Sequence, residues 1–334
     1  MKKLLSLLLA AAVAVTSAVI FAGCAGTEYP VEVANIKIEK EPENIVVLDA
    51  NAADIIAFMG YDGKIVGRSD QVNQTDLAAA PSVGDSSNPS VGKIKDSGAT
   101  VVFASGELSA SSAKSLEADG IKVVSISFAE TQKQLQSSYT AAGKILGGKI
   151  SGSVKGEESY KRLIDELKQI QSSIPVDPNS KNTPDTVCYL YSEGDNLKIM
   201  TQNTYGEMLL KYTNCENIAA EVDEDTVDVQ LLNKTKPKYI FYSDAAVLKA
   251  IKTDPVISKL PAVRDNNVLQ ITENEMKRQG GTAVNTVKRM VDFVYKGKRS
   301  NPNETTDAQA QQATQNVKVQ QATQATQAQQ ATKA

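Results

Sequence analysis

The feature that most constrains the fold of this chain is an alternation of short apolar runs with segments of helical period. Strands rich in Val, Ile and Tyr are predicted at 45–48, 65–67, 101–103, 123–126, 187–191, 239–242 and 268–271. Helices are predicted at 52–59, 110–118, 205–212 and 282–295. Strands that alternate with helices form βαβ units, so the sequence predicts an α/β fold with mainly parallel sheets.

One long amphipathic segment, residues 157–173, separates the two halves of the chain. Apolar side chains recur in it at helical spacing, and charged residues occupy its other faces. These apolar positions are Tyr160, Leu163, Ile164, Leu167 and Ile170. A polar connector between Pro175 and Pro184 follows. We therefore predict an N-terminal α/β lobe over 41–150, a connecting helix within 151–175 and a C-terminal α/β lobe over 176–300.

The N-terminal residues predict export and a lipid anchor. Lys2 and Lys3 precede an apolar run over 4–22, which leads into Gly23 and Cys24. A basic start, an apolar centre and small residues before a cleavage point are typical of a signal peptide, and the cysteine resembles that of the bacterial lipobox. We expect a signal peptide over 1–23, acylation of Cys24 including palmitate, a leader over 24–40, and a place on the extracytoplasmic face of the cell membrane. The alternative is a single membrane span with a chance cysteine.

Composition excludes several classes of function. The chain has 36 Lys+Arg against 39 Asp+Glu, so it lacks the positive excess that nucleic-acid binding requires. It has no histidine, which excludes Ser-His-Asp triads and imidazole metal sites. Residues 143–149 match G-x4-G-K but lack the Ser or Thr that holds magnesium, and we interpret them as a helix end. We expect no enzyme and no resident cofactor or metal; an extracellular enzyme would need a carboxylate pair such as Asp49 and Glu273.

The sequence also suggests the state of the two remaining cysteines and of the C-terminal tail. Cys188 and Cys215 are compatible with a disulfide of an exported domain, and Cys188 is equally compatible with a buried thiol. Residues 301–334 consist mainly of Gln, Ala and Thr. Because such a composition buries too little apolar surface to offset its ordering entropy, we expect this tail to be disordered.

Several blocks along the chain resemble, in their order and spacing, the helical-backbone substrate-binding proteins of ABC importers, which capture ferric siderophores, haem and cobalamin. The blocks are EPENIVVL at 41–48, DIIAFMG at 54–60, KIVG at 64–67, PSVG at 81–84, NPSV at 88–91, KPKYIF at 236–241, LPAV at 260–263 and NV at 267–268. The likeness covers about residues 36–297. It implies two α/β lobes joined by one stiff helix, with the ligand in a cleft between them and little movement on binding. We expect a monomer.

Candidate ligand-binding residues follow from the rule that ligands of parallel α/β folds lie beyond the carboxyl ends of the strands. The rule selects loops at 49–51, 68–70, 105–107, 242–244 and 273–279. The expected ligand contacts are Arg278 first, then Arg68, Lys277, Tyr242, Tyr205 and Asn51. Cationic side chains would pair with an anionic chelate. By similarity to the family, residues 276–280 lie where siderophore binders often place basic residues. Asn51 suits a helix cap equally well, and a tyrosine at a strand end suits packing within its own lobe.

The resemblance also raises a doubt about the permease partner. In the family each lobe presents a glutamate to permease arginines, and the matching positions here are Gly92 and Gln230, neither of which is acidic. Glu107, Glu207 or the acidic run 221–225 would have to compensate. We expect a lipid-anchored protein that captures an iron chelate for an ABC importer: a ferric siderophore first, then haem or cobalamin. The alternative is a surface ligand-binding, sensory or interaction module that keeps the fold without permease docking.

Overall fold

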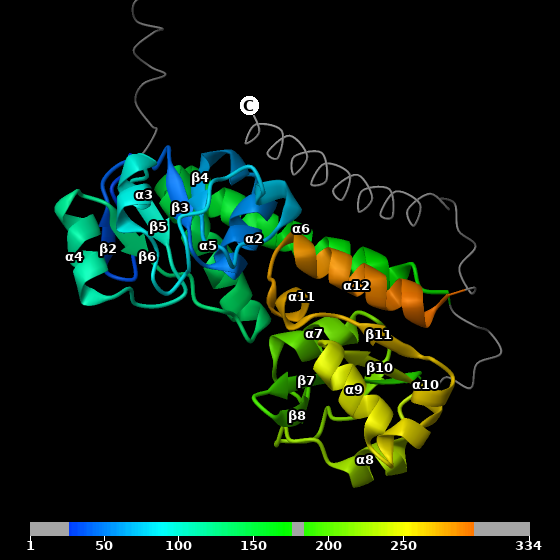
Figure 1. The fold of residues 1–334 in the computed structure, drawn as a ribbon. Coiled ribbons are helices and arrows are strands. Elements are labelled where there is room, and N and C mark those ends of the chain that lie inside the picture. Colours follow the sequence, from blue (N-terminus) through cyan, green and yellow to red (C-terminus); the bar gives the residue numbers. More distant parts are fainter. Residues whose placement is uncertain (1–26, 176–183, 297–334) are drawn as a thin grey trace, which may run out of the picture. The chain divides into compact units, whose positions relative to one another are not determined.

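The computed structural model describes residues 27–175 and 184–296. Of these, residues 27–174 and 184–294 belong to one compact unit. The predicted signal peptide, Cys24 and the tail over 301–334 lie outside the described residues. The compact unit contains two larger sheets with their helices, which we call the N-lobe and the C-lobe, and one short hairpin (Figure 1).

The N-lobe is built on a four-stranded parallel sheet in the order β4-β3-β5-β6. Its strands are β3 (Ile45–Val47), β4 (Ile65–Arg68), β5 (Val101–Phe103) and β6 (Lys122–Val124). Its helices are α2 (Ala50–Phe58), α3 (Val91–Asp96) and α4 (Ala110–Ala118), with short turns η1 (Asp62–Lys64) and η2 (Thr75–Leu77). The central strands β3 and β5 are apolar throughout and fully buried, as expected of a parallel sheet with both faces covered.

The C-lobe contains the sheet β11-β10-β7-β8, with β9 paired to β7. Its strands are β7 (Thr186–Glu193), β8 (Asn196–Ile199), β9 (Glu216–Asn217), β10 (Tyr239–Tyr242) and β11 (Val268–Gln270). Its helices are α7 (Tyr205–Lys211), α8 (Val229–Thr235), α9 (Ala245–Thr253), α10 (Pro261–Arg264) and α11 (Glu273–Lys277), with the turn η4 (Ile257–Lys259). All pairs are parallel except the β7–β8 hairpin. The prediction of α/β lobes with mainly parallel sheets is confirmed.

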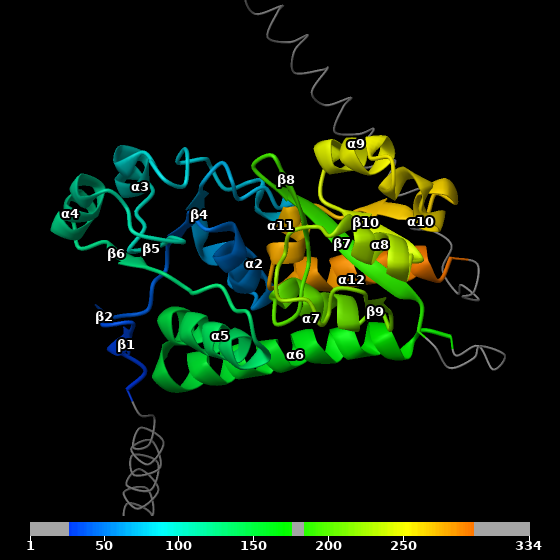
Figure 2. The same ribbon diagram turned by 90° about the horizontal axis from the view of Figure 1, so that it is seen from below.

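A pair of helices, α5 (Gln132–Gly147) and α6 (Ser153–Ser172), runs side by side and is joined by the π-helical turn η3 (Gly148–Gly152) (Figure 2). The predicted long helix over 157–173 is α6, which begins four residues earlier. The helices approach so closely that a methyl group at Gly143 or Gly152 would overlap the backbone of the other helix. The G-x4-G-K segment is thus the end of α5 and the turn after it, and its glycines permit this contact.

Two further elements attach to this helix pair. The last helix, α12 (Gly281–Val294), contacts α6, α2 of the N-lobe and α7 of the C-lobe, and Figure 1 shows it beside α6. Residues 31–38, expected as part of a leader, form the antiparallel hairpin β1 (Val31–Val33) and β2 (Ile36–Ile38). The alternation of Val and Ile with polar residues in this segment is the signal for a hairpin, and it is easily missed because each strand has only three residues.

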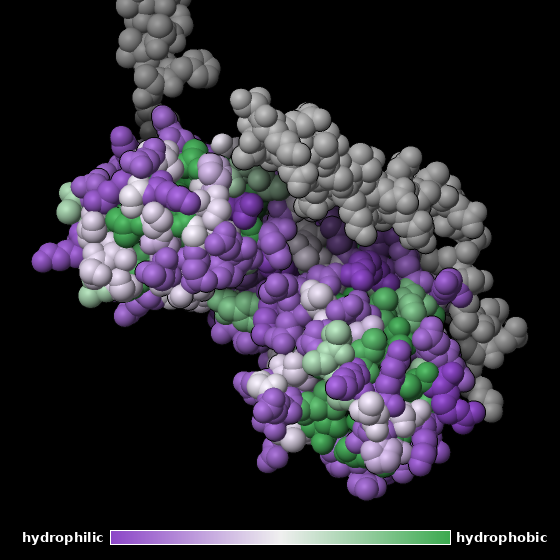
Figure 3. All heavy atoms as spheres, in the orientation of Figure 1, coloured by the Kyte–Doolittle hydropathy of each residue, from purple (hydrophilic) through white to green (hydrophobic). Residues whose placement is uncertain are grey.

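The surface in view mixes hydrophilic and hydrophobic residues on both lobes (Figure 3). Among the described residues, the large apolar side chains that are well exposed are Phe128, Ile150 and Val154. No helix in the described part of the chain has the length and apolar character that a membrane span requires. Cys188 is a buried thiol, so the second of the two alternatives for the cysteines is confirmed.

Candidate ligand-binding site

The three residues between α11 and α12, Arg278, Gln279 and Gly280, cross to the N-lobe, and we call them the inter-lobe strap. The Arg278 side chain donates from Nη1 to the Ala50 carbonyl oxygen at 2.6 Å and from Nη2 to Oδ1 of Asn73 at 3.2 Å. Burial lowers the pKa of this guanidinium, and the carboxylates of Asp54 and Asp49 oppose that effect. A buried cation whose donors meet N-lobe oxygens ties the strap to the N-lobe.

Gln279 makes the densest contacts of the strap. Its backbone N–H donates to Oδ1 of Asn51 at 2.9 Å, and Nδ2 of Asn51 donates back to Oε1 of Gln279 at 3.0 Å. The same amide accepts from the Ala129 N–H at 3.1 Å and donates to the Ala129 carbonyl oxygen at 2.5 Å. Gln279 is fully buried, so each of these bonds satisfies a group that water does not reach.

Asp54 of α2 receives the end of the strap. Its carboxylate accepts from the Gly280 N–H at 2.6 Å and from the Thr282 hydroxyl at 2.7 Å. Burial raises the pKa of Asp54, and these hydrogen bonds lower it in part. Two tyrosine hydroxyls complete the set, because Tyr139 donates to the Gln279 carbonyl oxygen at 2.7 Å and Tyr205 donates to that of Arg278 at 2.8 Å.

Two hollows of the described unit border this region. The larger, which we call the polar cleft, has a volume of about 660 Å³. Its charged and amide lining comprises Asp54, Asn73, Gln74, Asp76, Asn274, Glu275, Arg278 and Asn285. Asp54 and Arg278 are engaged within the strap contacts, and Glu275 pairs with Arg289. Gln74 donates from Nε2 to the Ala50 carbonyl oxygen, whereas its Oε1 is buried without a hydrogen-bond partner among the described residues.

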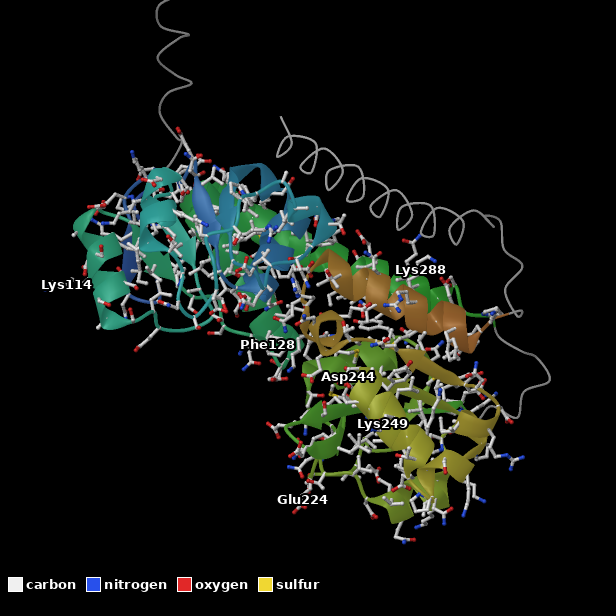
Figure 4. All side chains as sticks on the ribbon, in the orientation of Figure 1. Lys114, Phe128, Glu224, Asp244, Lys249 and Lys288 are labelled. Atoms are coloured by element: carbon white, nitrogen blue, oxygen red, sulfur yellow. The ribbon has the colours of Figure 1, made fainter. Side chains whose placement is uncertain are left out.

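The second hollow, the aromatic pocket, has a volume of about 260 Å³. Its lining residues are Phe128, Glu130, Tyr189, Tyr191, Glu193, Met200, Thr204, Tyr205, Gly206, Glu273, Met276 and Lys277. Phe128 and Tyr205 meet edge to face with ring centroids 5.7 Å apart, and Tyr189 and Tyr191 stack at 6.0 Å. Phe128, labelled in Figure 4, comes from the N-lobe, and the tyrosines come from the C-lobe. The pocket therefore draws its walls from both lobes.

The polar groups of the aromatic pocket are mainly acidic. Glu130, Glu193 and Glu273 line it against one cation, Lys277, whose ammonium lies 2.6 Å from the Glu273 carboxylate. The hydroxyl of Tyr189 is buried and has no hydrogen-bond partner among the described residues. Burial, with a further contribution from Glu273, raises the pKa of Tyr189. The phenol therefore stays protonated at neutral pH and can donate a hydrogen bond to a ligand oxygen.

The family model named Periplasmic binding protein matches residues 45–275. The chain belongs to this family. The curated relative "Uncharacterized ABC transporter substrate-binding lipoprotein YvrC" of Bacillus subtilis (strain 168) is 24% identical to this binding protein over 269 residues, which cover 78% of this chain and 82% of the relative.

Solved structures of other binding proteins share the fold. The periplasmic heme-binding protein RhuT from Roseiflexus sp. RS-1 aligns with a TM-score of 0.61 at 16% identity, covering 77% of this chain and 99% of that one. A possible iron-binding protein from Staphylococcus epidermidis gives 0.60 at 20% identity, covering 77% and 100%. The ABC-type Fe3+-hydroxamate transport system protein from Saccharomonospora viridis gives 0.57 at 18%, covering 80% and 99%. At these identities the likeness shows the fold alone.

The three cations predicted to meet in the cleft of this binding protein have different surroundings. Arg68 donates to the carbonyl oxygens of Ser69 and Val72 in its own loop and lines neither hollow described above. Arg278 borders the polar cleft from within the strap, and Lys277 stands at the aromatic pocket. Arg68 and Arg278 thus each donate to carbonyl oxygens nearby, and the contact of the three cations with one ligand stays a prediction.

The other predicted contacts divide in the same way. Tyr205 lines the aromatic pocket, whereas Tyr242 packs against the buried cluster of the C-lobe and Asn51 bonds the strap. Asp49, and not Asn51, caps α2 through its bond from the Ala52 N–H. Sequence reasoning gave no role to Glu130, whose carboxylate accepts from the Tyr205 N–H at 3.0 Å. Glu130 lies six residues beyond the end of β6 and outside the loops that the strand-end rule selected, so no local signal indicated it.

The two positions expected to correspond to docking glutamates, Gly92 and Gln230, are both exposed. Gly92 lies in the first turn of α3 and Gln230 in the first turn of α8. Of the acidic residues expected to compensate, Glu207 is buried and pairs with Lys211 at 2.8 Å. Glu107 is exposed. Within the described residues no group of three or more acidic or cysteine side chains is placed to hold a metal ion.

Proposed function

We propose that this chain is the substrate-binding component of an ABC importer and that it captures an iron chelate in the aromatic pocket. The observation that carries the proposal is a pocket with aromatic walls from both lobes and a buried, unpartnered phenol. Ligand pockets combine apolar and aromatic walls with a few polar groups that fix orientation. The relatives named above include proteins whose names refer to heme, iron and Fe3+-hydroxamate.

The charge of the aromatic pocket favours some classes of iron chelate over others. Three carboxylates face one lysine, which is itself paired with Glu273. A ferric tricatecholate carries three negative charges, and like charges repel. A ferric trihydroxamate is neutral, because three hydroxamates balance Fe³⁺, and a trihydroxamate with a free amine is cationic. We therefore favour a ferric hydroxamate over a catecholate, with haem next and cobalamin last.

The volume of the pocket adds a geometric expectation. About 260 Å³ lies just under the roughly 300–1,000 Å³ common for ligand pockets. A siderophore would therefore fill the pocket with part of its body and extend across the exposed ring of Phe128. Tyr189 would donate to a chelate oxygen at the floor, and Tyr191, whose hydroxyl donates to Asp225 at 3.0 Å, would be held in place as a wall.

Tyrosine fluorescence tests the proposal, because the chain has 11 tyrosines and no tryptophan. The purified protein is titrated with ferrichrome, ferrioxamine B, ferric enterobactin, haem and cobalamin. We expect quenching by the two hydroxamates, and about tenfold weaker binding by Phe128→Ala from lost apolar contact. Glu273→Gln weakens binding of the cationic ferrioxamine B more than that of neutral ferrichrome.

The matched control is Asp76→Asn, which removes a carboxylate from the polar cleft and leaves the aromatic pocket intact. We expect unchanged binding in this variant. Failure of all five ligands to bind refutes the function, whereas loss of binding in Asp76→Asn with normal binding in Phe128→Ala refutes the site alone.

The proposed partner is an ABC permease, and the proposed location is the outer face of the cell membrane. The exposed Gly92 and Gln230 offer no charge at the family's docking positions, so docking here would rest on shape and on other side chains. Co-purification with a permease supports the partnership. If the protein is instead a surface module without transport, it would still bind ligands in the titration, but no permease would co-purify with it.

A further inference from the structure

Two exposed aliphatic side chains stand together where α5 turns into α6. Ile150 lies in η3 and Val154 in the first turn of α6, four residues apart and therefore on one face. They are 51% and 49% exposed. Phe128, the third exposed apolar side chain of the described residues, lines the aromatic pocket, so this pair has no role in the proposed ligand site.

The chain that enters the fold is fastened to the same turn. The side chain of Glu28 accepts from the Ile150 N–H at 2.8 Å, and from the Ser151 N–H at 3.1 Å and hydroxyl at 2.5 Å. The Glu28 carbonyl oxygen accepts from the Lys149 N–H at 2.8 Å, and Tyr29 donates to the Ile145 carbonyl oxygen at 3.0 Å. The entry point of the chain is thus fixed beside Ile150.

The predicted lipid attachment is very near this point in sequence. Three residues separate Cys24 from Glu28. A chain spans at most about 3.6 Å per residue, so the acylated residue lies within about 14 Å of Glu28. An acyl chain on Cys24 is buried in the bilayer, and the η3 turn must therefore stay close to the membrane surface.

The charges around the aliphatic pair suit an anionic surface. Lys149 and Lys155 flank Ile150 and Val154, and Lys155 is held with its ammonium 3.8 Å from the ring centroid of Tyr61. Glu28, the acidic group at the turn, is engaged by backbone N–H groups. Acidic residues resume at Glu157 and Glu158, one turn further along α6, which sets the limit of the basic surface.

We propose that Lys149, Ile150, Val154 and Lys155 form a membrane-facing tip that rests on the anionic phospholipid surface when Cys24 is acylated. The two aliphatic side chains enter the headgroup region, and the lysines pair with phosphates. The tip fixes the orientation of the binding protein on the membrane. The proposal rests on acylation of Cys24 and is independent of which ligand is bound.

The absence of tryptophan gives a direct test, because a single introduced tryptophan is the only indole in the protein. Full-length acylated protein carrying Ile150→Trp or Lys249→Trp is reconstituted into vesicles of phosphatidylglycerol and phosphatidylethanolamine with a headgroup-level doxyl quencher. Lys249 is exposed on α9 of the C-lobe and serves as the matched control (Figure 4).

We expect quenching of the indole emission in the Ile150→Trp variant to exceed that in the control by about threefold, since interfacial side chains lie within about 5–10 Å of the headgroups. Adding Lys149→Glu and Lys155→Glu reduces the difference in these vesicles and leaves it unchanged in uncharged phosphatidylcholine. Equal quenching at the two positions overturns the proposal. So does failure of the protein to float with the vesicles, because the tether is then absent.

Discussion

Replacing Gln279 by leucine removes the side chain that joins the strap to the N-lobe while nearly keeping its volume. The variant leaves the N–H and the carbonyl oxygen of Ala129 without their partner, and both groups are fully buried. Asn51 also loses an acceptor, but this residue is only half-buried and water can replace the bond. The expected effect is therefore dominated by the two Ala129 groups.

An unpaired buried backbone group costs about 1–3 kcal/mol, so two of them cost roughly 2–6 kcal/mol. The apolar surface of leucine returns about 1 kcal/mol of this. We expect a net loss of about 3 kcal/mol in the free energy of unfolding. For a folded unit of this size such a loss lowers the melting temperature by roughly 6–12 °C.

Urea unfolding followed by far-UV circular dichroism measures the change in midpoint. Gln136→Leu is the matched control, because Gln136 is exposed on α5 and its amide faces water. We expect the control to change the free energy of unfolding by less than about 0.5 kcal/mol. The two variants could instead unfold at the same urea midpoint, with the same dependence of the unfolding free energy on urea concentration. That result would refute the reasoning that the Gln279 amide stabilises the contact between the lobes.

Three further predictions concern the helix pair, the entry point and a thiol. Gly152→Ala places a methyl group against the backbone of Gly143 and should cost about 3 kcal/mol in thermal unfolding, whereas Gly92→Ala, in open space on α3, should be neutral or stabilising. Hydrogen bonds from Ser151 and Ile150 lower the pKa of Glu28 from its usual 4.5. The Glu28 carboxylate therefore stabilises the fold above pH 4.5, and this contribution is lost as the pH falls through the lowered pKa. Glu28→Gln should therefore lower the urea midpoint at pH 7 but not in strong acid; a constant difference would contradict this. Burial raises the pKa of Cys188, so Ellman's reagent should modify it only after unfolding, and rapid native labelling would count against its burial.

The elements that the sequence predicted well are those with a strong local pattern. The apolar strands β3, β5, β7 and β10 and the amphipathic helix α6 follow from period and composition alone. The hairpin β1–β2 has the right alternation, but three residues per strand are too few to distinguish it from an extended segment. Local pattern therefore gave the two lobes and their connecting helix.

The candidate site was less predictable because its contacts join residues far apart in sequence. Asn51 and Gln279 are separated by 228 residues, and so are Arg278 and Ala50. An arginine in a strand-end loop suggests an anion, yet nothing in the sequence reveals that a carbonyl oxygen of the other lobe already occupies it. The strand-end rule did select residues 273–279, although Glu273–Lys277 form the helix α11 and not the expected loop. This helix supplies Glu273, Met276 and Lys277 to the aromatic pocket.

The inter-lobe strap has a consequence for how cargo leaves the protein. Separation of the two lobes would break the hydrogen bonds of Arg278, Gln279 and Gly280 to the N-lobe together. At about 1 kcal/mol each, these hydrogen bonds contribute several kcal/mol. Micromolar retention of a guest corresponds to about 8 kcal/mol. The cost of separating the lobes is thus a large fraction of the binding free energy of such a ligand, so spontaneous opening is rare. Much of the free energy for ligand release must therefore come from the transporter.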